Sequence, residues 1–263
     1  MSIPKKVESR LKAGLKKFRS IIDEARKADR SEQDTVTIVT DILAEVLGYH
    51  KYSDITGEYQ IRGTYCDLAV KVDDKLRFLI EVKAADRTLK DNHLRQATDY
   101  AAKEGIEWVI LTNAVEWHVH RMIFEQPVRH ERVFALNLLT DNSHVLEMLY
   151  LLSKEGAQKR AIRQYHKQIR ALNRFSLAAA VISEAVLKMI CREIKRASPG
   201  IRVDVQDVEE LIVREVVKRD VMDSAEVQDA VKRLRKAHGK KLKKRKPARP
   251  PTTPLPNDTL QVD

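Results

Sequence analysis

Two segments of the chain alternate between apolar and polar residues with the period of a β-strand. The first covers residues 65–72 and the second residues 76–83, and both are rich in β-branched and aliphatic residues. Asp73, Asp74 and Lys75 separate them and favour a turn, so the pattern predicts a β-hairpin. One face of this hairpin is apolar and predicts a core face, made of Leu68, Val70, Val72, Phe78, Ile80 and Val82.

Periodic segments on both sides of the hairpin predict further elements. Upstream, residues 31–48 have apolar residues at helical spacing, with a serine N-cap and a glycine C-cap. Downstream, residues 88–104 predict a second helix. Residues 108–112 form a continuous apolar run typical of a buried strand, and another strand passes through residues 117–122. These elements predict helices packed around a β-sheet.

The rest of the chain is almost continuously helical in character. Residues 1–28 predict a basic amphipathic helix, and residues 141–241 predict several consecutive helices that are interrupted at Pro199 and Gly200. An apolar stripe in the second region suits packing within the chain or against a second copy, as a homodimer. The pattern divides the chain into the N-terminal helix, a core of residues 29–140, this helical region and a disordered tail of residues 242–263.

The positive charge of the chain is concentrated near its end. The formal net charge is +11, and residues 231–249 contain eleven Lys or Arg and no acid, so the remainder is neutral. Such a run neutralises phosphates and predicts sequence-independent contact with nucleic acid. The alternative is a solubilising tail, which the Pro-rich stretch after it favours. Residues 1–28 likewise either line a nucleic-acid channel or form an ordinary solvated face. The predicted nucleic-acid-binding residues are Lys232, Arg233, Arg235, Lys236, Lys240, Lys241, Lys243, Lys244, Arg245 and Lys246.

Cysteine content and hydropathy exclude other classes of protein. Cys66 and Cys191 are the only cysteines, and no signal peptide opens the chain. No apolar run approaches the ~20 residues of a membrane span. We therefore expect a reduced, cytoplasmic protein without membrane contact.

Asp67, Glu81 and Lys83 are the candidate chemical groups. If the hairpin is centred on Asp74, antiparallel pairing places Asp67 opposite Glu81, with Cβ atoms about 4.5–5.5 Å apart. Lys83 shares their face because side chains alternate with a period of two. Opposed carboxylates repel each other unless a cation lies between them, and Mg²⁺ prefers oxygen ligands, here Asp67, Glu81 and the backbone carbonyl of Val82. Lys83 would orient an attacking water or offset the charge of a phosphorane-like transition state. The alternative is a surface hairpin with scattered charges.

Other polar residues flank the hairpin. Glu45 lies near the end of the first predicted helix and either reaches the metal site or is a solvated edge residue. Gln96 and Tyr100 are four residues apart and share one face of the second helix, where the alternative is an ordinary polar face. His118 and His120 share a face of the last strand, but no cysteine or acid cluster accompanies them. We interpret these two as ordinary strand histidines.

Glu45, Asp67, Glu81-Val-Lys83 and Gln96-x-x-x-Tyr100 together resemble the PD-(D/E)XK nuclease superfamily, in the branch whose helix carries a Gln-x-x-x-Tyr motif. Over residues 30–125 the chain is similar, more narrowly, to the N-terminal endonuclease domain of type I restriction enzyme R subunits. The matching segments are Cys66-Asp-Leu-Ala, Leu79-Ile-Glu-Val-Lys-Ala and Trp108-Val-Ile-Leu-Thr-Asn113. The superfamily's proline is absent, since a cysteine precedes Asp67, and relatives often lack that proline.

The resemblance implies a restriction-endonuclease-like α/β core, a mixed sheet of four or five strands flanked by helices, followed here by an α-helical C-terminal region. It also implies DNA cleavage that depends on Mg²⁺, with Mn²⁺ as the alternative. The implied catalytic residues are Asp67, Glu81, Lys83, Glu45, Gln96 and Tyr100. Among them the two hairpin acids bind the metal and the lysine is catalytic. The helical glutamate assists the metal site, and the Gln–Tyr pair positions substrate or water.

No Gly-x-x-x-x-Gly-Lys-Ser/Thr motif occurs in the sequence, so we expect no ATPase motor in it. The consistent expectation is a stand-alone restriction or defence endonuclease, or one that works with separately encoded partner subunits. Two alternatives stay open. One is a non-catalytic nucleic-acid-binding or assembly subunit that uses the nuclease fold as a scaffold. The other is a nuclease directed at RNA, because the catalytic set does not distinguish the two sugars.

Overall fold

The computed structural model describes the backbone of residues 2–61, 64–140 and 143–244, and the side chains of residues 2–59, 66–140 and 144–237. The chain forms two compact units, Met1–Lys167 and Gln168–Asp263. The division falls within helix α6 (Ala161–Ala171), whereas the sequence pattern places the start of the C-terminal helical region at residue 141. The first unit therefore includes helices that the sequence pattern assigns to that region.

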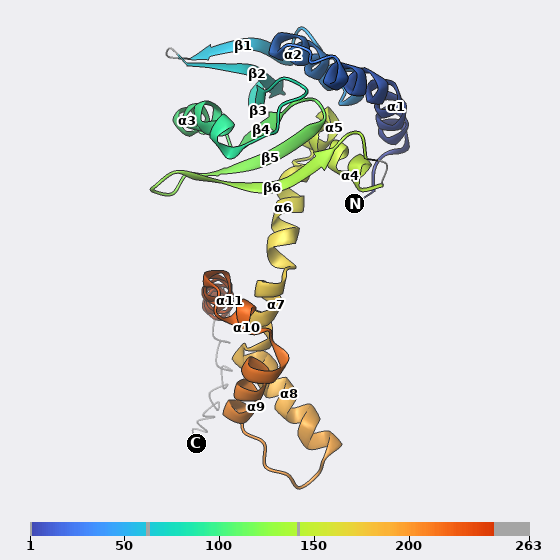
Figure 1. Ribbon diagram of the computed structural model, residues 1–263. Helices are drawn as coiled ribbons and strands as arrows, with labels where there is room; N and C mark the ends of the chain where they lie inside the picture. Colours follow the sequence, from blue (N-terminus) through green and yellow to red (C-terminus); the bar gives the residue numbers. More distant parts are fainter. Residues whose placement is uncertain (1, 62–63, 141–142, 245–263) are drawn as a thin grey trace, which may run out of the picture. The chain divides into compact units, whose positions relative to one another are not determined.

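The first unit contains a mixed six-stranded sheet in the order β1-β2-β3-β4-β5-β6 (Figure 1). β3 and β4 run parallel, and every other neighbouring pair is antiparallel. The strands are β1 (Ile55–Ile61), β2 (Thr64–Val72), β3 (Lys75–Val82), β4 (Trp108–Thr112), β5 (Glu116–Ile123) and β6 (Arg129–Asn137). The predicted α/β class is confirmed. The sheet has six strands rather than four or five, because β1 and β6 add an edge strand on each side.

The hairpin between β2 and β3 forms where the sequence predicts it. Asp73 and Asp74 occupy the turn with φ angles of 51° and 57°, as a two-residue type I′ turn requires. Leu68 pairs with Ile80 in the predicted register, and the register shifts by one residue after Val70. This bulge lies near the turn, so the register at the far end of the hairpin is the one that the sequence predicts.

Helices cover both faces of the sheet. Those on one face are α1 (Lys5–Lys27), α2 (Glu32–Asp41), its continuation η1 (Ile42–Val46) and α4 (Ser143–Leu152). Those on the opposite face are η2 (Asp91–Leu94) and α3 (Arg95–Glu104). The predicted apolar face of the hairpin, including Leu68 and Ile80, is buried beneath the first set. Ala97 and Ala101 let α3 pack closely against the other face.

The helix predicted at residues 88–104 begins later than the sequence pattern indicates. Lys90 has an extended backbone, and its N–H donates to His93 Nδ1 at 3.3 Å, which starts the short turn η2 before α3 begins at Arg95. Leu89 is buried in the core although it precedes the helix. The apolar spacing therefore continues across a loop that packs against the sheet.

The second unit is built from helices. They are α7 (Arg174–Val181), α8 (Glu184–Ala197), α9 (Val205–Leu211), η3 (Ile212–Val216), α10 (Arg219–Met222) and α11 (Ala225–Lys244). Pro199 and Gly200 lie between α8 and α9, as the sequence predicts. Within the part of the chain that the structure describes, no helix combines the length and the apolar composition of a membrane span.

The buried cores of the second unit are small. One contains Leu187, Cys191, Val208 and Ile212, and the other contains Ala178, Val221 and Val227. Large apolar side chains stay exposed, with 60% exposure for Leu211 and 71% for Val216. The homodimer through this region stays a prediction.

Candidate functional site

The hairpin register brings Asp67 and Glu81 to opposing positions. Leu68 pairs with Ile80, so the next position of each strand, away from the turn, holds Asp67 on β2 and Glu81 on β3. Asp67 Oδ2 accepts a hydrogen bond of 2.7 Å from the backbone N–H of Val82. This bond fixes the carboxylate of Asp67 beside the end of β3. Whether the backbone carbonyl of Val82 binds a metal stays a prediction.

Lys83 extends the cluster from the end of β3 to the start of α2. Its Nζ lies 2.9 Å from Glu81 Oε1 and 3.3 Å from Glu32 Oε1. Its backbone N–H donates to the carbonyl of Thr112 at 2.8 Å, which continues the pairing of β3 with β4. Side-chain exposure is 9% for Glu81, 19% for Lys83 and 49% for Glu32. The ammonium of Lys83 therefore lies between a buried acid, Glu81, and a solvent-exposed acid, Glu32.

Burial shifts the proton affinities of this cluster. Burial and the neighbouring Asp67 raise the pKa of Glu81 to about 6, although the hydrogen bond from Lys83 opposes the change. Burial also raises the pKa of Asp67, against the effects of the Val82 N–H and Lys83. Burial alone would lower the pKa of Lys83, but its hydrogen bond to Glu81 and the nearby carboxylates raise that pKa. Both carboxylates are therefore costly to ionise, and the lysine is protonated.

The donor set of the cluster suits a hard divalent cation. With three carboxylates ionised and one lysine protonated, Asp67, Glu81, Glu32 and Lys83 carry an excess of negative charge. Mg²⁺ is usually held by one or two carboxylates and keeps several waters. Among the described residues, no three His, Cys, Asp or Glu side chains form a metal-binding group by themselves. The residues thus fit a cation held by the two hairpin acids, with its remaining ligands from water or substrate.

The structure does not place Glu45 at this site. Its Oε2 lies 2.5 Å from Lys17 Nζ of α1. Glu45 follows Glu32 by thirteen residues on one continuous helical segment, which corresponds to roughly 20 Å along the axis at 1.5 Å per residue. Glu32 is the helical acid that contacts Lys83, and the sequence prediction missed it. Its place in the first turn after the N-cap Ser31 is also a common place for an acid that only stabilises a helix.

Gln96 and Tyr100 differ strongly in burial. Tyr100 is 1% exposed, packs edge-on against Tyr59 with ring centroids 6.2 Å apart, and has a buried hydroxyl without a hydrogen-bond partner among the described residues. Burial raises the pKa of this hydroxyl. Gln96 is exposed near the start of α3. Both residues lie on the helix that packs on the face of Asp67 and Glu81, and their contact with substrate stays a prediction.

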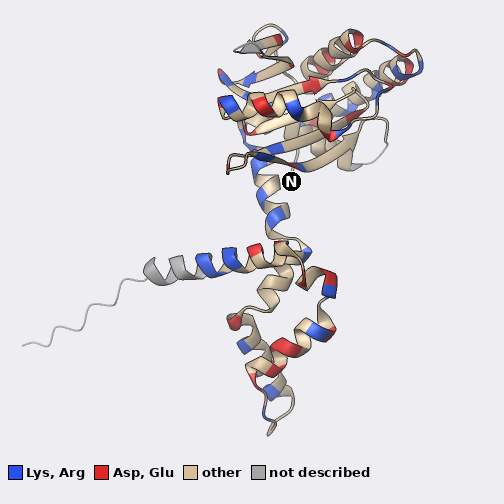
Figure 2. Ribbon diagram, turned by 60° about the vertical axis from the view of Figure 1, so that its left-hand side comes forward, with Lys and Arg blue, Asp and Glu red and all other residues tan. Residues whose placement is uncertain are grey.

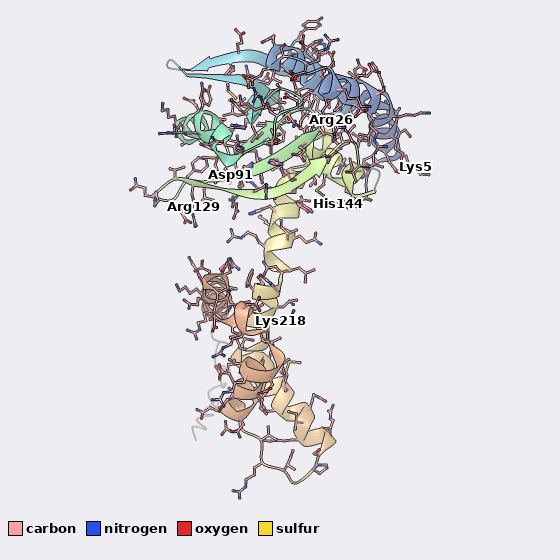
Figure 3. All side chains as sticks on the ribbon, in the orientation of Figure 1. Lys5, Arg26, Asp91, Arg129, His144 and Lys218 are labelled. Carbon is pink, nitrogen blue, oxygen red and sulfur yellow. The ribbon has the colours of Figure 1, made fainter. Side chains whose placement is uncertain are left out.

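His118 and His120 lie on β5 and do not join the acidic cluster. His120 Nδ1 lies 3.3 Å from His130 Nδ1 of β6, and His120 is 1% exposed. Burial and His130 lower the pKa of His120 to about 4, although Asp91, labelled in Figure 3, opposes the change. A buried, neutral His120 beside His130 of the neighbouring strand agrees with the interpretation of His118 and His120 as ordinary strand histidines.

The basic residues predicted to bind nucleic acid fall into three groups. Those exposed on α11 are Lys232, Arg233, Arg235 and Lys236, and Figure 2 shows the Lys and Arg residues of this helix in blue. Those whose backbone continues α11 but whose side chains lie outside the described residues are Lys240, Lys241, Lys243 and Lys244. Arg245 and Lys246 lie outside the described residues altogether. Nucleic-acid binding by this segment stays a prediction.

Comparison with known proteins relates part of the first unit to a protein family. A search of curated proteins and a search of solved structures gave no match. Residues 37–132 match the model of one protein family, and this range contains Asp67, Glu81 and Lys83 but begins after Glu32. That family is the Type I restriction enzyme R protein N terminus, so this part of the chain is similar to that domain of restriction enzymes.

Proposed function

We propose that the first unit is a metal-dependent nuclease of the PD-(D/E)XK type that hydrolyses DNA phosphodiester bonds as part of a restriction system. One observation carries the proposal: Lys83 contacts Glu81 at 2.9 Å beside Asp67, in a range that matches a restriction-enzyme family. DNA is the expected substrate because restriction enzymes act on DNA. The sequence contains no P-loop motif, so the proposal covers phosphodiester hydrolysis and not translocation.

Asp67 and Glu81 would hold the metal ion. Both carboxylates are partly or largely buried next to each other, where a cation would offset their repulsion. A bound Mg²⁺ would supply Lewis-acid stabilisation of the phosphate and lower the pKa of a water molecule. Mn²⁺ prefers similar oxygen ligands and would substitute for it.

Lys83 would position the attacking water and stabilise the transition state. An ammonium has three N–H donors, and two carboxylates, of Glu81 and Glu32, lie within 3.3 Å of its Nζ. The third donor can then be directed at the water or at a non-bridging phosphate oxygen. In the reaction, the water oxygen forms a bond to phosphorus, one P–O ester bond breaks, and the products are a phosphate monoester and a free hydroxyl. Donors fixed where charge develops lower the barrier most.

The test compares the protein with an Asp67→Asn variant on supercoiled plasmid, linear duplex and a single-stranded RNA of the same sequence. Each substrate is incubated with Mg²⁺, with Mn²⁺ and with EDTA. We expect DNA nicking or cutting that requires the metal and that falls at least about 100-fold in D67N. Cutting of plasmid but not of blunt linear ends would identify an endonuclease.

Asp41→Asn is the matched control. Asp41 is, like Asp67, an aspartate of the first unit, but it lies on α2 and pairs with Lys51 at 2.8 Å rather than with Lys83. This variant should cut DNA at the rate of the unmodified protein. Cutting that survives D67N unchanged would contradict the proposed site, and a preference for the RNA substrate would contradict the assignment to DNA. DNA binding without cleavage under every metal would favour the scaffold alternative.

A further inference from the structure

A cavity lies in the first unit, at the opposite end of β3 from the acidic cluster. It has a volume of about 150 Å³ and lies between the start of β3, the start of β4 and the turn from α5 (Lys154–Gln158) to α6. Phe78, Trp108 and Ile162 form its apolar wall. A cavity of about this size holds a benzene molecule in another protein, so the space suits a small chemical group rather than one water.

Arginine side chains dominate the charge of this cavity. Arg77, Arg160, Arg163 and Glu107 line it. Glu107 accepts hydrogen bonds from Arg163 Nε at 3.1 Å and from Arg121 Nε at 3.0 Å, so its carboxylate is already shared by two guanidinium groups. Among the described residues, Arg77 and Arg160 have no carboxylate partner. The four charged groups that line the cavity therefore leave it with two uncompensated positive charges.

Arg77 and Arg160 differ in how the fold accounts for them. Arg77 Nε is buried and has no hydrogen-bond partner among the described residues, and such a donor is costly unless a ligand or water satisfies it. Arg160 has a φ of 54°, a left-handed conformation that glycine or asparagine adopts at lower cost. Arg160 directly follows the C-cap of α5, where helices commonly end in this conformation, so its backbone is explained by the helix end, whereas the buried Arg77 Nε is not explained.

We propose that this cavity binds a phosphoryl group. A phosphate monoester carries roughly −1.5 to −2 charge at neutral pH, which balances the two uncompensated guanidinium groups. Guanidinium forks bind phosphate oxygens through paired N–H donors, and Arg77 Nε would donate one such bond. The apolar wall with Trp108 would contact the organic part of the ligand. The group comes either from a small phosphate ester, such as a nucleotide, or from the 5′-phosphate end of a DNA strand.

The cavity is separate from the candidate active site. Arg77 and Lys83 are six residues apart along one strand, which corresponds to roughly 20 Å at about 3.3 Å per residue. A phosphate bound beside Lys83 therefore does not reach Arg77. The proposal does not depend on nuclease activity, because it rests on residues at the other end of the sheet.

Trp108 provides a direct signal for binding. The chain has two tryptophans, and only Trp108 lines this cavity. Intrinsic fluorescence of the full-length protein is titrated, in EDTA and at constant ionic strength, with inorganic phosphate, AMP, acetate, and a 5′-phosphorylated and an unphosphorylated oligonucleotide. We expect a saturable change with phosphate and AMP and none with acetate. A stronger response to AMP identifies a small ester as the ligand, and a preference for the phosphorylated oligonucleotide over AMP identifies a strand end.

Variants of the two free arginines test the assignment. Arg77→Met keeps the length of the side chain, and Arg160→Gly removes the charge while relieving the left-handed backbone, so that at least R160G should fold. Each should weaken phosphate binding about tenfold or more, since a charge-assisted hydrogen bond is lost. Lys159→Ala, a neighbouring exposed residue outside the cavity, should bind as before. Absence of any response up to millimolar phosphate, or equal binding by R160G and K159A, would overturn the proposal.

Discussion

The two ends of β3 and β4 carry opposite charge. Because these strands are parallel, Arg77 and Glu107 lie at the edge where both strands start, whereas Glu81 and Lys83 lie where β3 ends. At the starting edge, cations outnumber the acid. Burial would raise the pKa of Glu107, but hydrogen bonds from Arg163 and Arg121 outweigh it and lower that pKa. At the other edge, acids outnumber the cation, and the pKa of Glu81 is raised to about 6.

This difference shows how burial and partners decide whether a carboxylate stabilises a fold. Glu107 is surrounded by guanidinium groups, so its ionised form contributes to stability. Glu81 shares one lysine with Asp67 and Glu32, so its ionised form is a cost that the rest of the core offsets. Sites for charged ligands characteristically retain such unbalanced groups. Four experiments would break or sharpen the comparison.

Lys83→Met should have the largest effect. It removes the only cation that contacts Glu81 in the described structure and the donor proposed for the reaction. DNA cleavage in Mg²⁺ should fall at least about 100-fold. The loss of charge balance should also raise the pKa of Glu81 further. Initial rates on supercoiled plasmid measure the first effect, and a rate within threefold of the unmodified protein would contradict the role of Lys83.

Glu107→Gln should destabilise the first unit by about 2 kcal/mol, since hydrogen bonds to charged groups are lost and two guanidinium groups remain near each other. Urea denaturation at pH 7, followed by circular dichroism, gives the change in the free energy of unfolding. A stability equal to or above that of the unmodified protein would show that Glu107 does not stabilise the arginines around it.

Glu81→Gln should raise the stability of the metal-free protein, whereas Glu107→Gln should lower it. In metal-free protein, the folded state keeps the proton of Glu81 up to a pKa of about 6, whereas its ordinary pKa is 4.5. Stability therefore decreases as the pH rises from about 4.5 to about 6, and above that range ionisation costs about 2 kcal/mol. E81Q lacks this cost, so at pH 7 in EDTA it should unfold at higher urea concentration. A pH profile of stability identical to that of the unmodified protein would contradict the raised pKa.

The comparison of Glu32→Gln with Glu45→Gln should give the smallest effect of the four experiments. It tests whether Glu32, which contacts Lys83 in the structure, or Glu45, which the sequence predicts, contributes to cleavage. Glu32 contacts Lys83 at 3.3 Å from an exposed position, so its loss should slow cleavage about tenfold. Glu45 pairs with Lys17 instead, so its loss should leave the cleavage rate nearly unchanged. Plasmid nicking rates at saturating Mg²⁺ measure both. If E45Q slowed cleavage more than E32Q, the site would include Glu45 as the sequence predicts.

The central hairpin could be predicted from the sequence because two local signals agree. The alternation of residues 65–72 and 76–83 fixes the faces, and a turn centred on Asp74 gives the register at Leu68 and Ile80, which the structure reaches with a two-residue turn and the bulge after Val70. The edge strands lack such signals. β1 contains a glycine and a positive-φ residue, Glu58, and β6 begins with several charged residues because one side of an edge strand meets solvent.

The absence of Glu32 from the sequence prediction of the candidate site has a different cause. Helical spacing places residues on a face, but it does not say which end of a helix approaches which strand. Only the packing of α2 against the hairpin brings its first turn, rather than its last, to Lys83. Glu32 is far from the hairpin in sequence, and an acid in the first turn of a helix is common. The sequence therefore contains no pattern that marks Glu32 as part of the cluster. The second charged site was missed for the same reason, since Arg77, Glu107 and Arg160 come from separate segments.

The two-residue turn at Asp73 and Asp74 has a consequence for how this domain can change over evolution. With the bulge after Val70 kept, inserting or deleting one residue there would shift β3 by one position against β2 and exchange its two faces. Ile80 and Val82 would then lie beside Asp67, while Glu81 and Lys83 would enter the apolar core. Point substitutions can alter the site one group at a time, but a length change in the hairpin would abolish it in a single step. We therefore expect the length of this turn to be inherited as strictly as the acids themselves.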